Sequence, residues 1–151
     1  MFTALLIVHG LLAVALLGAI SHQAVAACWP APKTAGTFTG RFRAVAAPAY
    51  ANAIVVLYVV TFIFGAVIYT EYRIFVRPVV EELKMWPANG AFELKEHFAA
   101  IGMGMLPAYW YLWRRPAEGQ ARAIVTALLA LIVWWSFLTG HILNNIRGFG
   151  S

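Results

Sequence analysis

Apolar residues fall into four long stretches, and most charged residues lie between them. The stretches cover residues 2–28, 49–69, 92–113 and 123–146. Each approaches or exceeds the roughly 20 apolar residues that a helix needs to cross the hydrocarbon core of a bilayer. Within them, Lys, Arg, Asp and Glu occur only at the start of the third stretch, as Glu93, Lys95 and Glu96. The pattern predicts an all-α membrane protein with four transmembrane helices.

The connections between the stretches are short. Residues 29–48 are rich in Pro, Gly and Thr, and residues 114–122 form a basic turn that contains a proline and a glycine. Residues 78–86 combine apolar and charged residues in a short run, which is typical of a short amphipathic helix lying at the membrane interface. Because no internal repeat is visible, we expect residues 1–151 to form one integral membrane domain built as a four-helix bundle.

The composition indicates that lipid surrounds most of the chain. Hydrophobic residues make up 62% of the sequence and charged residues 11%, whereas soluble domains carry about 25% charged residues. A soluble protein of this size has too little interior to bury so much apolar surface. The net charge of +5 comes from basic residues that flank the apolar stretches, so no nucleic-acid partner is expected. The single cysteine, Cys28, excludes a disulfide framework and a Cys-rich metal site.

The end of the first stretch, Val25-Ala26-Ala27-Cys28, is similar to the cleavage motif of a bacterial lipoprotein signal. However, no basic residue precedes the apolar run, and His9 and His22 interrupt it. We therefore interpret this stretch as a retained transmembrane helix.

Four spans place both termini on the same side of the membrane, which we call side A. The connections at residues 29–48 and 114–122 then lie on the opposite side, side B. Side B carries six basic residues and side A five. Because basic residues favour cytoplasmic loops, we expect side B in the cytoplasm and both termini in the periplasm.

The four histidines all lie inside the predicted spans, where ionisable groups are costly and usually face a bundle interior or a cofactor. At about 1.5 Å per residue, His9, His97 and His141 lie about 10, 7 and 8 Å from side A. Neutral imidazole binds haem iron, copper or zinc. We expect no Cys, Asp or Glu at the same depth, which argues against hydrolytic zinc and favours one b-type haem.

Two of these three histidines are expected to bind the iron. If the helices form a simple up–down ring, the first and third are diagonal and about 13 Å apart, which favours His9 with His97. His141 would then serve a second site or the propionate side, although another packing could pair it with either histidine. His22 lies about 20 Å along the helix from His9 and is turned by about 220°, so we expect it to form hydrogen bonds or to lie beside a quinone.

The last span ends with three polar residues that follow His141. Asn145 shares the helix face of His141 at i+4, and Asn144 and Arg147 lie close by in the sequence. These three residues could hold haem propionates through charge-assisted hydrogen bonds. Alternatively, they simply end the span at the interface.

The four spans and their intramembrane histidines resemble small bacterial four-helix transmembrane b-type cytochromes, broadly of the cytochrome b561 kind. The resemblance implies a protein of the bacterial inner membrane that transfers electrons in a respiratory chain. It implies one haem b rather than two, because the second span has no histidine. Expected partners are membrane lipid, other membrane redox subunits, and a quinone or a soluble c-type cytochrome. Without a catalytic apparatus of its own, the chain would be an electron-transfer component of an oxidoreductase complex.

Two other functions fit the same pattern. The chain could be a cofactor-free structural or assembly subunit of a respiratory or photosynthetic complex, with its histidines in helix packing. It could also be a copper-handling membrane protein that uses His9, His97 and His141. The acidic residues of side A either attract a basic partner protein or pair with neighbouring Lys and Arg residues; they are Glu81, Glu82, Glu93 and Glu96.

Overall fold

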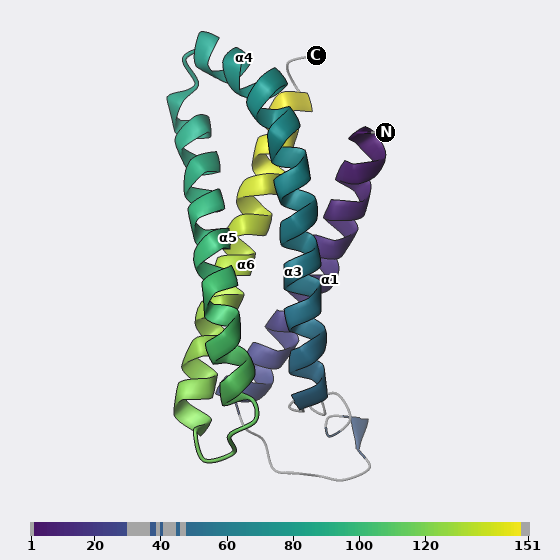
Figure 1. The fold of residues 1–151 in the computed structure, drawn as a ribbon, viewed down its shortest axis with the longest axis vertical. Coiled ribbons are helices and arrows are strands. Elements are labelled where there is room, and N and C mark those ends of the chain that lie inside the picture. The colour runs from purple at the N-terminus through teal and green to yellow at the C-terminus, as the bar shows by residue number, and fades with distance from the viewer. Residues whose placement is uncertain (1, 30–36, 39, 41–44, 46–47, 149–151) are drawn as a thin grey trace.

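The computed structural model describes residues 2–29, 37–38, 40, 45 and 48–148, with side chains in the last helix described through Asn145. Four long helices lie side by side (Figure 1). The start of the first helix, at Phe2, and the end of the last, at Gly148, lie at the same end of the bundle. The elements in chain order are α1 (Phe2–Cys28), α3 (Pro48–Glu71), the π-helical turn η1 (Tyr72–Val76), α4 (Arg77–Glu82), α5 (Trp86–Leu112) and α6 (Gly119–Gly148).

The helices form the simple up–down ring that the pairing of His9 with His97 assumed. Helix α1 contacts α3 and α6, and α5 contacts the same two helices from the other side. Within the described part of the chain, the diagonal pairs α1–α5 and α3–α6 have no close backbone approach. The all-helical fold and the helical nature of all four apolar stretches are thereby confirmed.

Three segments are long and apolar enough to cross a membrane, which indicates a membrane protein. These segments are Thr3–Cys28, Pro48–Glu82 and Gly119–Asn145. They expose large aliphatic side chains such as Leu11, Val56 and Leu131, as expected of helices that are surrounded by lipid. Helix α5 has 27 residues, but its first half carries three charged residues, and it is not among the three apolar segments.

The segment between the second and third predicted spans differs from expectation. We predicted one amphipathic helix over residues 78–86. Instead, the helical run of α3 continues through η1 into α4 and ends at Glu82. Residues 83–85 form a turn, in which Lys84 has a positive φ of 55°. Helix α5 begins at Trp86, with a proline in its first turn, where proline is favoured because no amide hydrogen is needed.

The earlier start of α5 changes the position of its charged residues. The predicted third span begins at Phe92, which would place Lys95 and Glu96 in the first turn. Because the helix begins at Trp86, these residues lie between two and three turns inside it. They are therefore part of the bundle and not of its edge.

The hydrophobic core fills the half of the bundle toward side B. On α1, the buried residues Leu16, Ile20 and Gln23 all lie in the second half of the helix. Buried residues on α3 lie in its first half and include Ile54 and Tyr58. Between residue 3 and residue 15, α1 has no buried residue, so its first half packs less closely than its second. The half of the bundle toward side A thus retains space among its helices.

Candidate cofactor cavity

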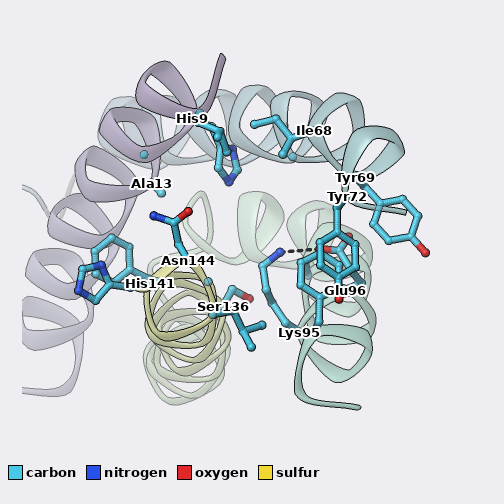
Figure 2. A pocket seen from close by; sticks show the side chains of 18 of the residues that line it. His9, Ala13, Ile68, Tyr69, Tyr72, Lys95, Glu96, Ser136, His141 and Asn144 are labelled. Carbon is cyan, nitrogen blue, oxygen red and sulfur yellow. Dashed lines mark hydrogen bonds and ion pairs between the residues drawn. The ribbon is translucent and has the colours of Figure 1, made fainter. Parts of the chain in front are cut away.

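A cavity of about 1030 Å³ occupies the side-A half of the bundle. Residues from α1, α3, η1, α4, α5 and α6 line it, and Figure 2 shows the polar side chains that face it. Ligand pockets in proteins measure roughly 300–1,000 Å³, with mostly apolar walls and a few polar groups. The cavity lies at the upper end of that range and has the same character.

His9 is the histidine that points into this cavity from α1 (Figure 2). Its ring packs against α3 at Gly65, where an added Cβ would come within 3.2 Å of His9 Cε1. The Thr61 carbonyl lies close to the ring, but the buried Nδ1 atom makes no hydrogen bond of ordinary geometry to any described residue. Buried polar atoms in proteins nearly always have a partner, so His9 has the capacity to bind a ligand.

Lys95 and Glu96 of α5 reach the cavity from the side opposite His9. Their charged groups form an ion pair of 2.5 Å, with the lysine side chain 16% and the glutamate side chain 31% exposed. The Lys95 ammonium also lies 4.6 Å from the centre of the Phe92 ring. The expectation that no acidic residue shares the depth of the histidines is therefore wrong, because Glu96 lines the same cavity as His9.

His97 does not belong to the cavity. The α5 residues that line it include Phe92, Lys95, Glu96 and Ala99, which are spaced as one face of a helix. At about 100° per residue, His97 lies about 200° around the helix from Lys95, and its side chain is exposed. The structure thus does not bring His97 together with His9, although the ring order that suggested this pair is present.

His141 of α6 lines the edge of the cavity. Its ring stacks in parallel on Phe137 at 6.2 Å, and its Nε2 atom lies 3.2 Å from Asn145 Nδ2. This contact confirms that the two residues share a helix face. Figure 2 shows His141 set aside from the centre of the cavity, where His9, Asn144 and Lys95 converge.

The three residues proposed to hold propionates have different positions. Asn144 lines the cavity and points toward His9 (Figure 2). Asn145 is exposed and contacts His141. The Arg147 side chain lies outside the described residues. Of the described pair, Asn144 is the residue placed to contact a ligand in the cavity.

His22 lies in the other half of the bundle, among polar and aromatic side chains. It meets the Tyr50 ring edge-on, with ring centres 6.5 Å apart. Nearby, the Tyr50 hydroxyl donates to the Ala19 carbonyl at 3.4 Å, and the Tyr109 hydroxyl donates to the buried Gln23 side chain. His22 is not part of the cavity lining.

Sequence reasoning missed Lys95 and Glu96 as cavity residues, and it also missed Ser136. The Ser136 hydroxyl is buried and, among the described residues, has no hydrogen-bond partner. On α5, the spacing of Ala88, Phe92, Lys95 and Ala99 would have identified the helix face that lines the cavity. Apolar or small residues at i, i+4 and i+11 indicate an inward stripe, and Lys95 lies within that stripe.

The acids of side A are largely paired. Arg77 Nε lies 2.7 Å from Glu81 Oε1, and the same guanidinium lies 3.0 Å from Glu93. Together with the Lys95–Glu96 pair, these contacts agree with the reading in which the acids neutralise neighbouring basic residues.

Within the described ranges of the chain, no three His, Cys, Asp or Glu side chains gather closely enough to hold a metal ion. The three histidines of the copper hypothesis do not meet. A haem iron needs only one or two protein ligands, so its requirement differs from that of a copper ion held by three residues.

Comparisons of the chain with protein families, with curated proteins and with solved structures found no match. The geometry of the cavity and the residues that face it therefore carry the functional argument.

Proposed function

We propose that the chain is a membrane electron-transfer subunit whose side-A cavity would hold one b-type haem, with His9 as a ligand of the iron. The observation that carries the proposal is the His9 ring, which faces a large, mostly apolar cavity. Its buried Nδ1 atom lies close to the Thr61 carbonyl but makes no hydrogen bond of ordinary geometry to any described residue. When bound, such a haem supplies reversible one-electron chemistry at its iron.

The residues around His9 fit this role. Imidazole is a common ligand of haem iron. Gly65 lets the ring pack against α3, and Gly10 and Ala13 leave space beside it. Lys95 and Asn144 offer polar contacts to the acidic edge of a porphyrin. The apolar walls would exclude water and so keep the local dielectric low, which tunes the potential of a bound iron.

His141 is the second histidine of the cavity lining and thus the candidate for a second protein ligand of the iron. It lies on α6, next to α1 in the ring. In the present arrangement its Nε2 contacts Asn145. A haem held by His9 alone and one held by both histidines are distinguished by the His141→Ala variant, which would change the spectrum only in the second case.

In this proposal, α5 is the fourth transmembrane span. It closes the ring between α3 and α6, and it turns Lys95 and Glu96 toward the cavity and away from lipid. Intramembrane charges usually face a bundle interior and pair with one another, so these residues are compatible with a span. The turn between α4 and α5 would then lie at the membrane surface.

We further propose residence in a bacterial inner membrane, with both termini in the periplasm, on the basis of the six basic residues of side B against five on side A. Electrons would pass between a quinone or a membrane redox subunit and a partner at side A, such as a soluble c-type cytochrome. Turnover of a substrate would belong to the complex.

The visible spectrum of the purified protein tests the haem. We expect sharp reduced bands of a b-type haem in the wild type and their loss in His9→Ala. His97→Ala is the matched control, because His97 is an exposed histidine of the same half of the bundle that lies outside the cavity. A wild-type protein without porphyrin bands after expression with added haem would refute the proposal and favour a structural or assembly subunit.

A further inference from the structure

The cavity contains a charged pair that the bundle itself does not require. Lys95 and Glu96 are neighbours in the sequence, and both lie on the face of α5 that lines the cavity. Their ion pair forms within one helix and does not link two helices. Since charged side chains inside a membrane protein are costly and usually functional, the pair needs an explanation beyond packing.

Lys95 has the better position of the two to meet a ligand. Its side chain is the less exposed, and its ammonium points to the region where His9 and Asn144 also converge (Figure 2). An added Cβ at Gly140 of α6 would lie 3.8 Å from Lys95 Cε, so the lysine stem crosses the space between α5 and α6. The cavity thus presents a cationic donor amid mostly apolar walls.

Glu96 has the features of a partner that can be replaced. Its side chain is about twice as exposed as that of Lys95, at 31% against 16%. A carboxylate on a ligand would offer Lys95 the same charge-assisted hydrogen bond that Glu96 offers now. The Asn144 amide group can donate a second hydrogen bond to the same carboxylate from α6.

We propose that Lys95 exchanges Glu96 for a carboxylate of the ligand and so makes the cavity specific for a flat apolar molecule that carries a free acid group. The inference rests on the proposed function, in which this ligand is haem and the acid is a propionate. Lys95 is then the specificity-determining residue for the acidic edge, while His9 binds the iron.

The test compares two porphyrins that differ only at the acid groups. The purified protein, in detergent, is titrated with haem and with haem dimethyl ester, in which both propionates are blocked. Because the new charge-assisted hydrogen bond replaces the one that Glu96 gives up, only part of its strength is gained, and we expect haem to bind about 10-fold more tightly than the ester. Lys95→Met should lose most of this preference and keep only the part that the Asn144 hydrogen bond supplies.

Two variants complete the experiment. Lys95→Arg should keep the preference for the free acid, because the cation is retained. Arg77→Met is the matched control, since it removes a side-A cation that does not line the cavity, and it should also keep the preference.

Equal binding of haem and its ester to the wild type would overturn this inference and leave the proposed function intact. A preference of undiminished size in Lys95→Met would overturn it in the same way. If the wild type binds neither porphyrin, the proposed function fails, and this inference fails with it. The wild-type comparison needs no variant, so a Lys95 variant that does not fold leaves the test decisive.

Discussion

The contact between Tyr58 and Gly102 gives a sharp prediction about how α3 and α5 pack. The Tyr58 hydroxyl donates a hydrogen bond to the Ala99 carbonyl at 2.9 Å. Its ring lies directly over Gly102, where an added Cβ would overlap the phenol oxygen. The same Cβ would lie 3.1 Å from Ile132 Cγ2 of α6. Gly102→Ala should therefore force the tyrosine to move at the boundary between the core and the cavity.

The expected cost follows from three effects. Overpacking of a well-packed site costs about 1–3 kcal/mol, and loss of the Tyr58 hydrogen bond costs about 0.5–1.5 kcal/mol. The higher helix propensity of alanine offsets about 1 kcal/mol of this. We therefore expect Gly102→Ala to lower the free energy of unfolding by about 2 kcal/mol, measured by denaturation in mild detergent and followed by circular dichroism.

Gly104→Ala is the matched control for this experiment. Gly104 lies on the same helix, is exposed, and would place its Cβ with nothing within 4 Å. Its substitution should leave the stability unchanged or raise it by up to about 1 kcal/mol. Tyr58→Phe removes the overlapping oxygen, so Gly102→Ala should cost less in that background, with a coupling of about 1 kcal/mol. The packing argument is refuted if Gly102→Ala and Gly104→Ala have the same stability.

Two further predictions concern the side-B half. Tyr109→Phe removes the hydroxyl that donates to the buried Gln23 side chain. Because this acceptor is then unsatisfied, the free energy of unfolding should fall by about 1–3 kcal/mol. Tyr111→Phe, at an exposed position, should change the stability little. A cysteine at the exposed Ala117, in a chain with Cys28 replaced by Ser, should resist a membrane-impermeant thiol reagent in intact cells, because side B is expected in the cytoplasm. Rapid labelling would instead place both termini in the cytoplasm.

The sequence predicted the helices well because apolar length is a strong signal. Helix α1 begins and ends where the first apolar stretch does, and α3 and α6 extend the second and fourth by a few residues. The ring order was only assumed, and the structure has it: consecutive helices lie side by side, as short connections favour. These features depend on hydrophobicity and chain length alone, and both can be read without knowing which face of a helix is inside.

The site was harder to predict because depth does not determine the direction of a side chain. His97 and Lys95 lie at similar depths on α5, yet one is exposed and the other lines the cavity. A rotation of the helix by half a turn would exchange them. In an apolar membrane helix the lipid face and the core face have similar side chains, so the hydrophobic pattern gives little information about this rotation.

Helix α5 connects the prediction of the helices with the prediction of the site. It was the helix whose start was predicted least well, and it is also the helix that falls below the hydropathy of a simple span. Lys95 and Glu96 lower the hydropathy of the first half of the helix. The missed start, residues 86–91, contains a proline, an asparagine and a glycine, which made it look like a connection. The same two side chains supply the charged groups of the cavity. Polar groups that face the interior of a bundle lower the hydropathy of the helix that carries them, and high hydropathy is the property by which spans are recognised. The predicted span with the lowest hydropathy is therefore the first place to look for a functional site.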